Sequence, residues 1–379
     1  MPSSRRLAEE ELLRRLPTAT PDEREALQEL FLQWGFEDDH LTRLRRARPW
    51  QRADSALVLA RMQVREALPA ILALLRHPNR ELRLAALRAV ELLGDPDAIE
   101  PLVKVLPEVK HTAWRMVWAA LIACARAQPE RLLAHISHPD VRVREVVAAV
   151  LAEVAPPEVL VELLVHPDDP EPEVRAKRAW ALGRSGSPRA LPVLARWTQD
   201  PVWYVRLRAV GALGALGDRS AHEFLLPATR DSHIRVRQKS ASSLYLLWGD
   251  PIYLIDLLRQ QVPDRYALEA LVSELEWRGV AWEAINSVTA PVAGRREQSR
   301  ELVRHFLSIG ACTSVLYAVE MHPDLALRHA LLELVGEALP TDRYLDLVQV
   351  LASPYLDAGT RRAVEKLVAF PGNADDDLG

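Results

Sequence analysis

Histidine and cysteine are the residues of this sequence most able to bind a metal ion. The tightest grouping is His135 and His138 with Asp140, which falls short of the full ligand set of a metal site. His138 occupies a turn position that aspartate fills in neighbouring segments, where a short polar side chain caps a helix. Cys124 and Cys312 lie far apart within apolar runs, as is typical of buried thiols. We predict no metal, cofactor-binding or catalytic residue.

Three glycines, Gly211, Gly214 and Gly217, could suggest a loop that binds a nucleotide phosphate. Such a loop must follow a β-strand and open a helix. Here helical spacing runs through the glycines and ends at Gly217, the usual place for a glycine that stops a helix. We therefore expect that the packing of neighbouring helices accounts for them. The sequence also contains no G-x-S-x-G or Walker-type motif.

An arginine returns about every 31 residues, and such a row of cations could bind phosphates or hold turns together. A short polar residue and often a proline precede it, and in four copies a glycine follows about eleven residues later. These signals predict a first helix that starts at the turn, a stop, and a second helix, repeated as a stacked array. We expect each arginine to contact an acidic or carbonyl group in a turn, which gives a structural arginine–aspartate ladder. Its members are Arg52, Arg83, Arg115, Arg144, Arg175, Arg206 and Arg237.

Residues 82–106, 174–200 and 205–231 resemble the short, bacterial type of HEAT repeat. The resemblance implies an all-α, right-handed α-solenoid of stacked antiparallel helix pairs, and a binding role without chemistry. We predict a helical cap over residues 1–46, regular repeats over 47–261, divergent repeats over 262–370 and a disordered acidic tail over 371–379. In the divergent part, looser helical units surround Arg265 and Arg300, and Arg328 returns to the pattern. A bend or break is expected over residues 287–294.

The formal net charge is −4, which disfavours nonspecific nucleic-acid binding. The charged N-terminus lacks the apolar stretch of a signal peptide or a membrane helix, so we predict a cytoplasmic protein in a reducing compartment. Some proteins that this chain resembles carry a membrane segment ahead of the repeats, so peripheral membrane association is left open. The sequence does not indicate the oligomeric state.

Aromatic residues gather around the turn that contains Trp203 and Tyr204. Exposed aromatic rings beside arginines often contribute most of the affinity of an interface, although such rings can also fill the core between repeats. The candidate partner-binding residues are Arg196, Trp197, Trp203, Tyr204, Arg230 and Arg235.

The predicted function is a noncatalytic scaffold or adaptor that binds a protein or peptide on a concave face made by the second helices and on the adjoining turns. One alternative is an enzyme subunit like the bilin lyases, which some short HEAT-like repeats resemble. Another is a HEAT-like DNA glycosylase or other nucleic-acid binder. Those glycosylases need a carboxylate beside aromatic residues, whereas Trp114 and Trp118 have no acid between them.

Overall fold

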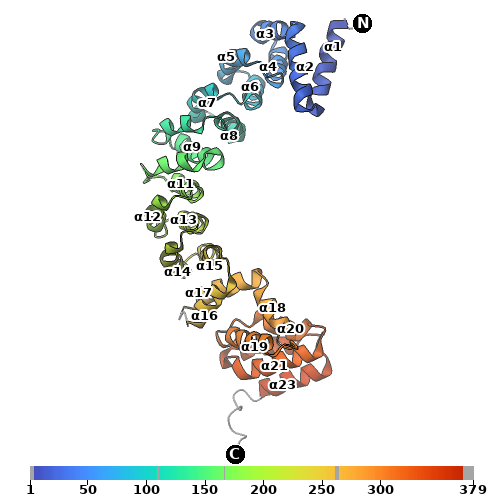
Figure 1. The fold of residues 1–379 in the computed structure, drawn as a ribbon, viewed down its shortest axis with the longest axis vertical. Helices are drawn as coiled ribbons and strands as arrows, with labels where there is room; N and C mark the ends of the chain where they lie inside the picture. Colours follow the sequence, from blue (N-terminus) through green and yellow to red (C-terminus); the bar gives the residue numbers. More distant parts are fainter. Residues whose placement is uncertain (1–3, 109–110, 166, 261–263, 370–379) are drawn as a thin grey trace, which may run out of the picture. The chain divides into compact units, whose positions relative to one another are not determined.

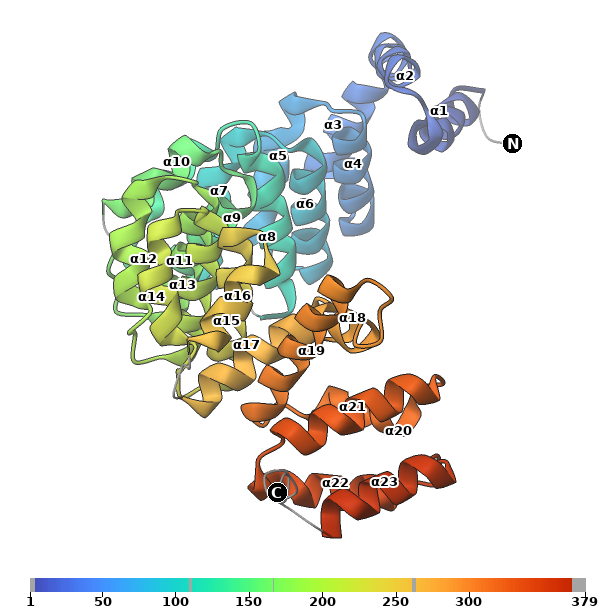
Figure 2. The ribbon, with the colours of Figure 1, turned by 60° about the horizontal axis from the view of Figure 1, so that its bottom comes forward.

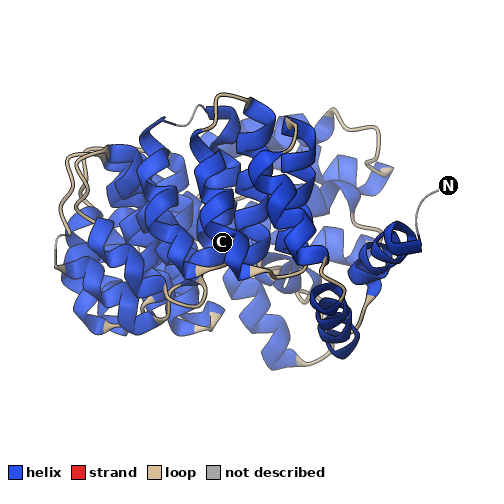
Figure 3. Cartoon of the chain, turned by 90° about the horizontal axis from the view of Figure 1, so that it is seen from above, coloured by secondary structure: helices blue, strands red, loops and turns tan. Residues whose placement is uncertain are grey.

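The computed structural model describes residues 4–108, 111–165, 167–260 and 264–369, and these ranges contain helices and turns but no strand (Figures 1 and 3). They belong to two compact units, Met1–Val193 and Leu194–Gly379. Helices alternate as stacked pairs along both units, which confirms the predicted all-α solenoid. The predicted disordered tail lies outside the described residues.

In unit 1 (Met1–Val193), three helices come before the pairs: α1 (Ser4–Arg15), α2 (Pro21–Gln33) and α3 (Phe36–Arg46). The first helices of the pairs are α4 (Pro49–Arg61), α6 (Arg80–Leu93), α8 (His111–Ala125), α9 (Val141–Val154) and α11 (Pro172–Arg184). The second helices are the shorter α5 (Leu68–Ala73), α7 (Ile99–Val105), a 3-10 segment (Pro129–His135) and α10 (Pro157–Val161). Helix α12 (Leu191–Trp197) crosses the division between the units.

Unit 2 (Leu194–Gly379) continues with the first helices α13 (Trp203–Leu216), α15 (Ile234–Trp248), α17 (Arg265–Trp277), α19 (Ala293–Ser308), α21 (Leu325–Ala338) and α23 (Ala358–Ala369). Its second helices are α14 (His222–Ala228), α16 (Pro251–Arg259), α18 (Val280–Asn286), α20 (Thr313–Met321) and α22 (Tyr344–Leu351). Consecutive first helices α13, α15 and α17 lie side by side (Figure 2).

Local signals set the ends of the first helices. Asp140 caps α9, because its carboxylate accepts a hydrogen bond of 2.8 Å from the Arg142 amide. Gly94 and Gly217 end α6 and α13 in the left-handed conformation, at φ values of 60° and 74°, which a glycine adopts without strain.

The glycines inside α13 allow its neighbour to approach. A Cβ added at Gly214 would lie 2.9 Å from the Cα of Ser243 on α15, so any side chain there would push the two helices apart. Together with the role of Gly217 as a helix stop, this contact confirms that packing rather than phosphate binding accounts for the glycines.

In unit 1 the first helices form the inner row. Consecutive first helices pack along one another, and their row is more closely spaced than the row of second helices (Figure 1). In a curved stack, the closely spaced row lies on the concave side. The prediction that second helices line the concave face is therefore wrong for unit 1, because the short second helices lie on its outer side.

The N-terminal helices are fastened to the first pair through a buried histidine. His40 on α3, with 1% of its surface exposed, lies 2.6 Å from the Glu9 carboxylate on α1 and 3.1 Å from the Ser55 hydroxyl on α4. A serine, a histidine and a carboxylate can form a catalytic triad. Ser55 is itself only 1% exposed within α4, so its hydroxyl has no access to a substrate and the contact serves to hold three helices together.

Candidate functional site

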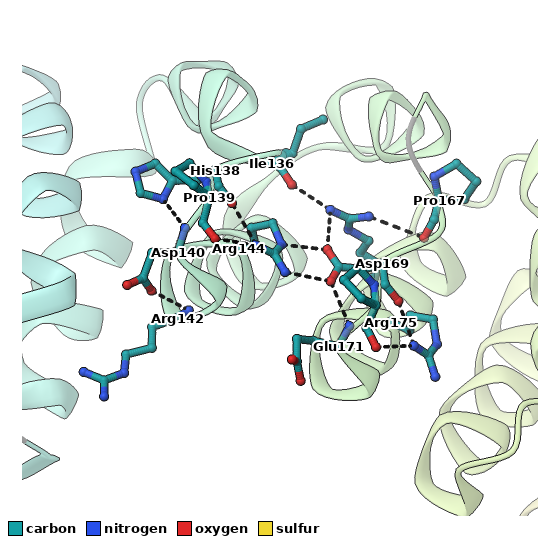
Figure 4. Close-up of polar contacts among 12 residues, drawn as sticks. Ile136, His138, Pro139, Asp140, Arg142, Arg144, Pro167, Asp169, Glu171 and Arg175 are labelled. Carbon is teal, nitrogen blue, oxygen red and sulfur yellow. Dashed lines mark hydrogen bonds and ion pairs between the residues drawn. The ribbon is translucent and has the colours of Figure 1, made fainter.

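The repeated arginines close the turns ahead of the first helices, as Figure 4 shows for Arg144. Its Nη1 donates hydrogen bonds of 2.9 and 3.1 Å to the carbonyls of His138 and Pro139. Its Nε and Nη2 donate 2.8 and 3.0 Å bonds to the two carboxylate oxygens of Asp169, in the next turn. The side chains of Arg144 and Asp169 are 12% and 4% exposed, so this two-pronged ion pair is largely buried.

The same contact to the carbonyls six and five residues earlier recurs along both units. Arg206 also makes a paired contact with the Asp231 carboxylate, at 2.7 and 2.8 Å. The arginines that donate to both carbonyls are Arg83, Arg144, Arg175, Arg206 and Arg237. The predicted contact with turn carbonyls is thus confirmed at these positions, and the contact with an aspartate at Arg144 and Arg206. We call Asp169 and Asp231 the ladder aspartates.

The ion pairs shift the pKa of both partners. Burial alone would raise the pKa of each ladder aspartate, but hydrogen bonds from Arg144 or Arg206 and from a backbone amide outweigh it, so the pKa is lowered. The same hydrogen bonds raise the pKa of Arg144 and Arg206. All four groups are therefore held in their charged forms and are already engaged with one another, which leaves them poorly suited to bind a phosphate.

One predicted ladder position needs correction. Arg115 is exposed and is the fifth residue of α8, whereas the ladder arginines are the fourth of their helices, so Trp114 occupies the equivalent place. In the looser units, Arg265 begins α17 and pairs with Glu269 at 2.9 Å, and Arg300 pairs with Glu333 at 3.0 Å.

In α19 the fourth residue is Arg296, and it donates a 3.0 Å bond to the Ala290 carbonyl, six residues earlier. Arg328 likewise donates to the carbonyl six residues earlier, that of His322. The predicted return of the pattern at Arg328 is confirmed, and Arg296 shows that it resumes one repeat sooner.

Trp203 forms the centre of a layered aromatic surface at the start of α13. Its ring lies parallel to the His233 ring, with centroids 3.9 Å apart and planes at 1°. The Tyr204 ring meets it edge-on at 5.8 Å, and the Arg235 guanidinium carbon lies 5.9 Å from its centroid. We call Trp203, Tyr204, His233 and Arg235 the Trp203 platform. All four side chains are at least partly exposed.

The remaining candidates divide into core and surface. Trp197 is 3% exposed, so the expectation that it contacts a partner is wrong for this structure, and its ring fills the core instead. Arg196 and Arg230 are exposed near the ends of α12 and α14. His233 was missed by the sequence reasoning, although it lies close to one repeat period after Trp203.

The expected bend over residues 287–294 coincides with the turn between α18 and α19. Beside it, a cavity of about 530 Å³ opens between α16, α18 and α19, lined in part by Ile255, Ser287 and Leu302. The cavity is compatible with a break in the stack here, which stays a prediction.

Features relevant to the alternative functions are few. Trp114 and Trp118 stack on α8 with centroids 6.1 Å apart.

Within the described ranges no group of three histidine, cysteine or acidic side chains is placed to hold a metal ion. No single described helix has both the length and the apolar character needed to span a membrane, though α19 and α20, bent by 117°, meet that test as a pair.

Comparison with known proteins adds the family. A family model for HEAT repeats matches residues 38–127, 129–207 and 197–275, together more than half of the chain. No curated protein matches the sequence significantly.

Solved structures with a related fold include human deoxyhypusine hydroxylase, importin beta and Kap121p bound to Ste12p. Human deoxyhypusine hydroxylase is 16% identical, with 64% of this chain and 98% of that chain covered and a TM-score of 0.29. Importin beta is 13% identical, with 87% of this chain and 57% of that chain covered and a TM-score of 0.40. Kap121p is also 13% identical, with 94% of this chain and 48% of that chain covered and a TM-score of 0.45. The chain thus spans about half the length of Kap121p, and these distant likenesses assign no activity or partner.

Proposed function

Because the chain belongs to the HEAT-repeat family, we propose that it is a noncatalytic protein-interaction scaffold whose protein or peptide partner contacts the Trp203 platform. The observation that carries this proposal is the parallel stack of Trp203 on His233 at 3.9 Å. The stack holds a large, partly exposed ring in a fixed orientation at the surface. A rigid aromatic ring beside an arginine loses little conformational entropy on binding, which makes it suited to an interface.

The ladder supports the proposal indirectly. Its arginines and aspartates already form hydrogen bonds and ion pairs in the turns. The residues that recur along the array therefore hold the stack together. Two residues of the Trp203 platform, Trp203 and His233, differ from their equivalents in other repeats. A surface of that kind can be specific to one partner without weakening the array. We further propose a cytoplasmic location, in keeping with the free, buried Cys124 and Cys312.

The test is partner capture with the double variant Trp203→Ala/Tyr204→Ala. Proteins captured from a lysate by the wild-type chain are identified by mass spectrometry and then compared between variants. We expect the double variant to lose the specific partner and to retain its melting temperature within a few degrees. Trp50→Ala is the matched control, because Trp50 is 64% exposed in unit 1; it should capture the partner normally. If the double variant melts like Trp197→Ala, a core substitution, the platform is packing and the proposal fails.

A further inference from the structure

Helices α13 and α15 carry an uncompensated positive charge. Together they contain five cationic residues and no aspartate or glutamate. The next first helix, α17, contains three glutamates and one arginine. Helices α13 and α15 are thus two adjacent first helices with cations and no acidic residue, in a chain whose net charge is −4.

Two of the five cations are used within the fold. Arg206 pairs with Asp231, and Arg237 donates to turn carbonyls while its guanidinium carbon lies 4.6 Å from the Tyr266 centroid. Among the described residues, no carboxylate lies within 4.0 Å of the charged groups of Arg208, Arg235 or Lys239. These three cations remain available to a ligand.

The three cations belong to one regular surface. On α15, Arg235, Lys239, Ser242 and Leu246 follow one another at spacings of four, three and four, so they lie on one helical face. The equivalent residues 31 positions earlier and later lie on α13 and α17. We call this set the first-helix face: Tyr204, Arg208, Gly211, Ala215; Arg235, Lys239, Ser242, Leu246; Tyr266, Ala270, Ser273, Trp277.

Gly211, a small residue in the middle of the first-helix face, leaves room for a cation from the neighbouring helix. A Cβ added at Gly211 would lie 2.8 Å from Cε of Lys239, so the Lys239 side chain lies across α13 at that glycine. Its ammonium group therefore extends from α15 toward the helix that carries Arg208. The glycine has a second role here, beyond helix packing, because any larger residue would displace the lysine.

Exposed apolar side chains border the first-helix face at both ends. Tyr266 is 55% exposed at one end, and Leu246 and Trp277 are 52% and 74% exposed at the other. Arg278 supports this second end, with its guanidinium carbon 4.1 Å from the Tyr245 centroid and 4.7 Å from that of Trp277. Along α15 the two ends are about 16 Å apart at a rise of about 1.5 Å per residue, the reach of about five residues of extended peptide.

We propose that the first-helix face binds a short, extended acidic peptide segment of a protein partner. Carboxylates of the segment contact Arg208, Arg235 and Lys239, and apolar residues at its ends pack on the Trp203 platform and on Leu246 with Trp277. This inference rests on the proposed function, because it names the chemistry of the same partner. A peptide is favoured over a nucleic acid because the positive charge ends at α17, where three glutamates outnumber one arginine and would repel a longer run of phosphates.

The experiment is selection of a random twelve-residue peptide library displayed on phage against the full chain. We expect enrichment of aspartate and glutamate next to an aromatic or leucine residue. The best peptide is then synthesised with a fluorescent label, and its affinity is measured by polarisation beside an analogue with asparagine and glutamine in place of the acids. Arg208→Gln/Lys239→Gln should weaken binding about tenfold, because two partly exposed charge pairs are lost. Arg362→Gln, an exposed arginine on α23, is the control and should bind normally.

Several results would overturn the inference: no enrichment, enrichment of lysine and arginine, equal affinity for the uncharged analogue, or normal binding by the double variant. A twelve-residue oligothymidine that binds more tightly than the selected peptide would favour a nucleic acid instead. Because the selection needs no natural partner, its failure leaves the capture experiment with Trp203→Ala/Tyr204→Ala unaffected. That experiment can fail on its own if the platform is only packing.

Discussion

Replacement of Arg144 by methionine tests whether the ladder stabilises the array through its ion pairs or only through its turn contacts. Methionine keeps most of the aliphatic volume and removes the guanidinium. The matched control is Arg83→Met, because Arg83 donates to two turn carbonyls, at 2.8 and 2.8 Å, as Arg144 does. Arg144 additionally holds the Asp169 carboxylate, which is 4% exposed. The difference between the two variants isolates the buried pair.

The expected magnitudes differ clearly. Loss of two turn hydrogen bonds in Arg83→Met costs about 1–2 kcal/mol of unfolding free energy, since each contributes about 1 kcal/mol net. Arg144→Met loses the same two bonds and also leaves a buried carboxylate without its main partner, which costs about 3–5 kcal/mol. Arg178 lies 3.4 Å from Asp169 and is 2% exposed, so the carboxylate keeps one cationic neighbour in Arg144→Met. We therefore expect a loss of unfolding free energy at the lower end of this range, about 3 kcal/mol.

Hydrogen exchange followed by mass spectrometry suits this comparison, because a stacked array opens locally rather than in a single transition. Amide protection in α9 and α11 should fall much more in Arg144→Met than protection in α6 falls in Arg83→Met. Equal losses of protection in the two variants would show that the ion pair contributes no net stability.

Two further predictions concern packing and pH. Gly214→Ala should lower the free energy of unfolding by about 1–3 kcal/mol, because the added methyl meets the backbone of the neighbouring helix. Gly211→Ala meets only a flexible lysine, so its free energy of unfolding should stay within about 1 kcal/mol of wild type. Similar urea midpoints for the two variants would contradict this prediction. The lowered pKa of the ladder aspartates means that their stabilisation is complete above about pH 4 and is lost as the pH falls through the folded-state values. Between pH 7 and 3, the melting temperature of Asp169→Asn/Asp231→Asn should therefore fall less steeply at the acid end than that of the wild type. Parallel curves for the two proteins would show that protonation of the ladder aspartates does not destabilise the fold.

The repeat architecture could be predicted because its signals are local. A capping residue, a proline and a stop glycine each act within one turn of chain, so they need no knowledge of distant contacts. The same property explains the errors. Arg115 lies one residue away from the equivalent of the other ladder arginines, and a pattern of residue types alone could not distinguish it from Trp114. Arg296 was not predicted at all, since only the start of α19 shows that it is the fourth residue of its helix.

Features that depend on contacts between repeats were less accessible. Which row of helices lies on the inner side of unit 1 depends on how closely the long first helices pack. That packing could not be predicted from the sequence alone. Trp197 could have been recognised as core, because it follows the buried Leu194 by three residues on one helical face. The stack of Trp203 on His233 joins two turns, and the 31-residue period could have suggested it. The geometry of the stack, with planes at 1°, could not be read from the sequence.

The first helices separate the residues that hold the array from those that can bind a partner. On α15, Val236, Ser240 and Leu244 are buried and occupy positions that are also buried in α13, so they are constrained by the neighbouring helix. The exposed positions at 235, 239, 242 and 246 contact solvent on the opposite side. A substitution there changes charge or shape with little effect on the stack, since stability in such arrays comes from contacts between neighbouring repeats. The change from Tyr204 to Arg235 to Tyr266 along equivalent positions is therefore the kind of variation that would encode a ligand, and it is located where the positive charge of α13 and α15 is concentrated.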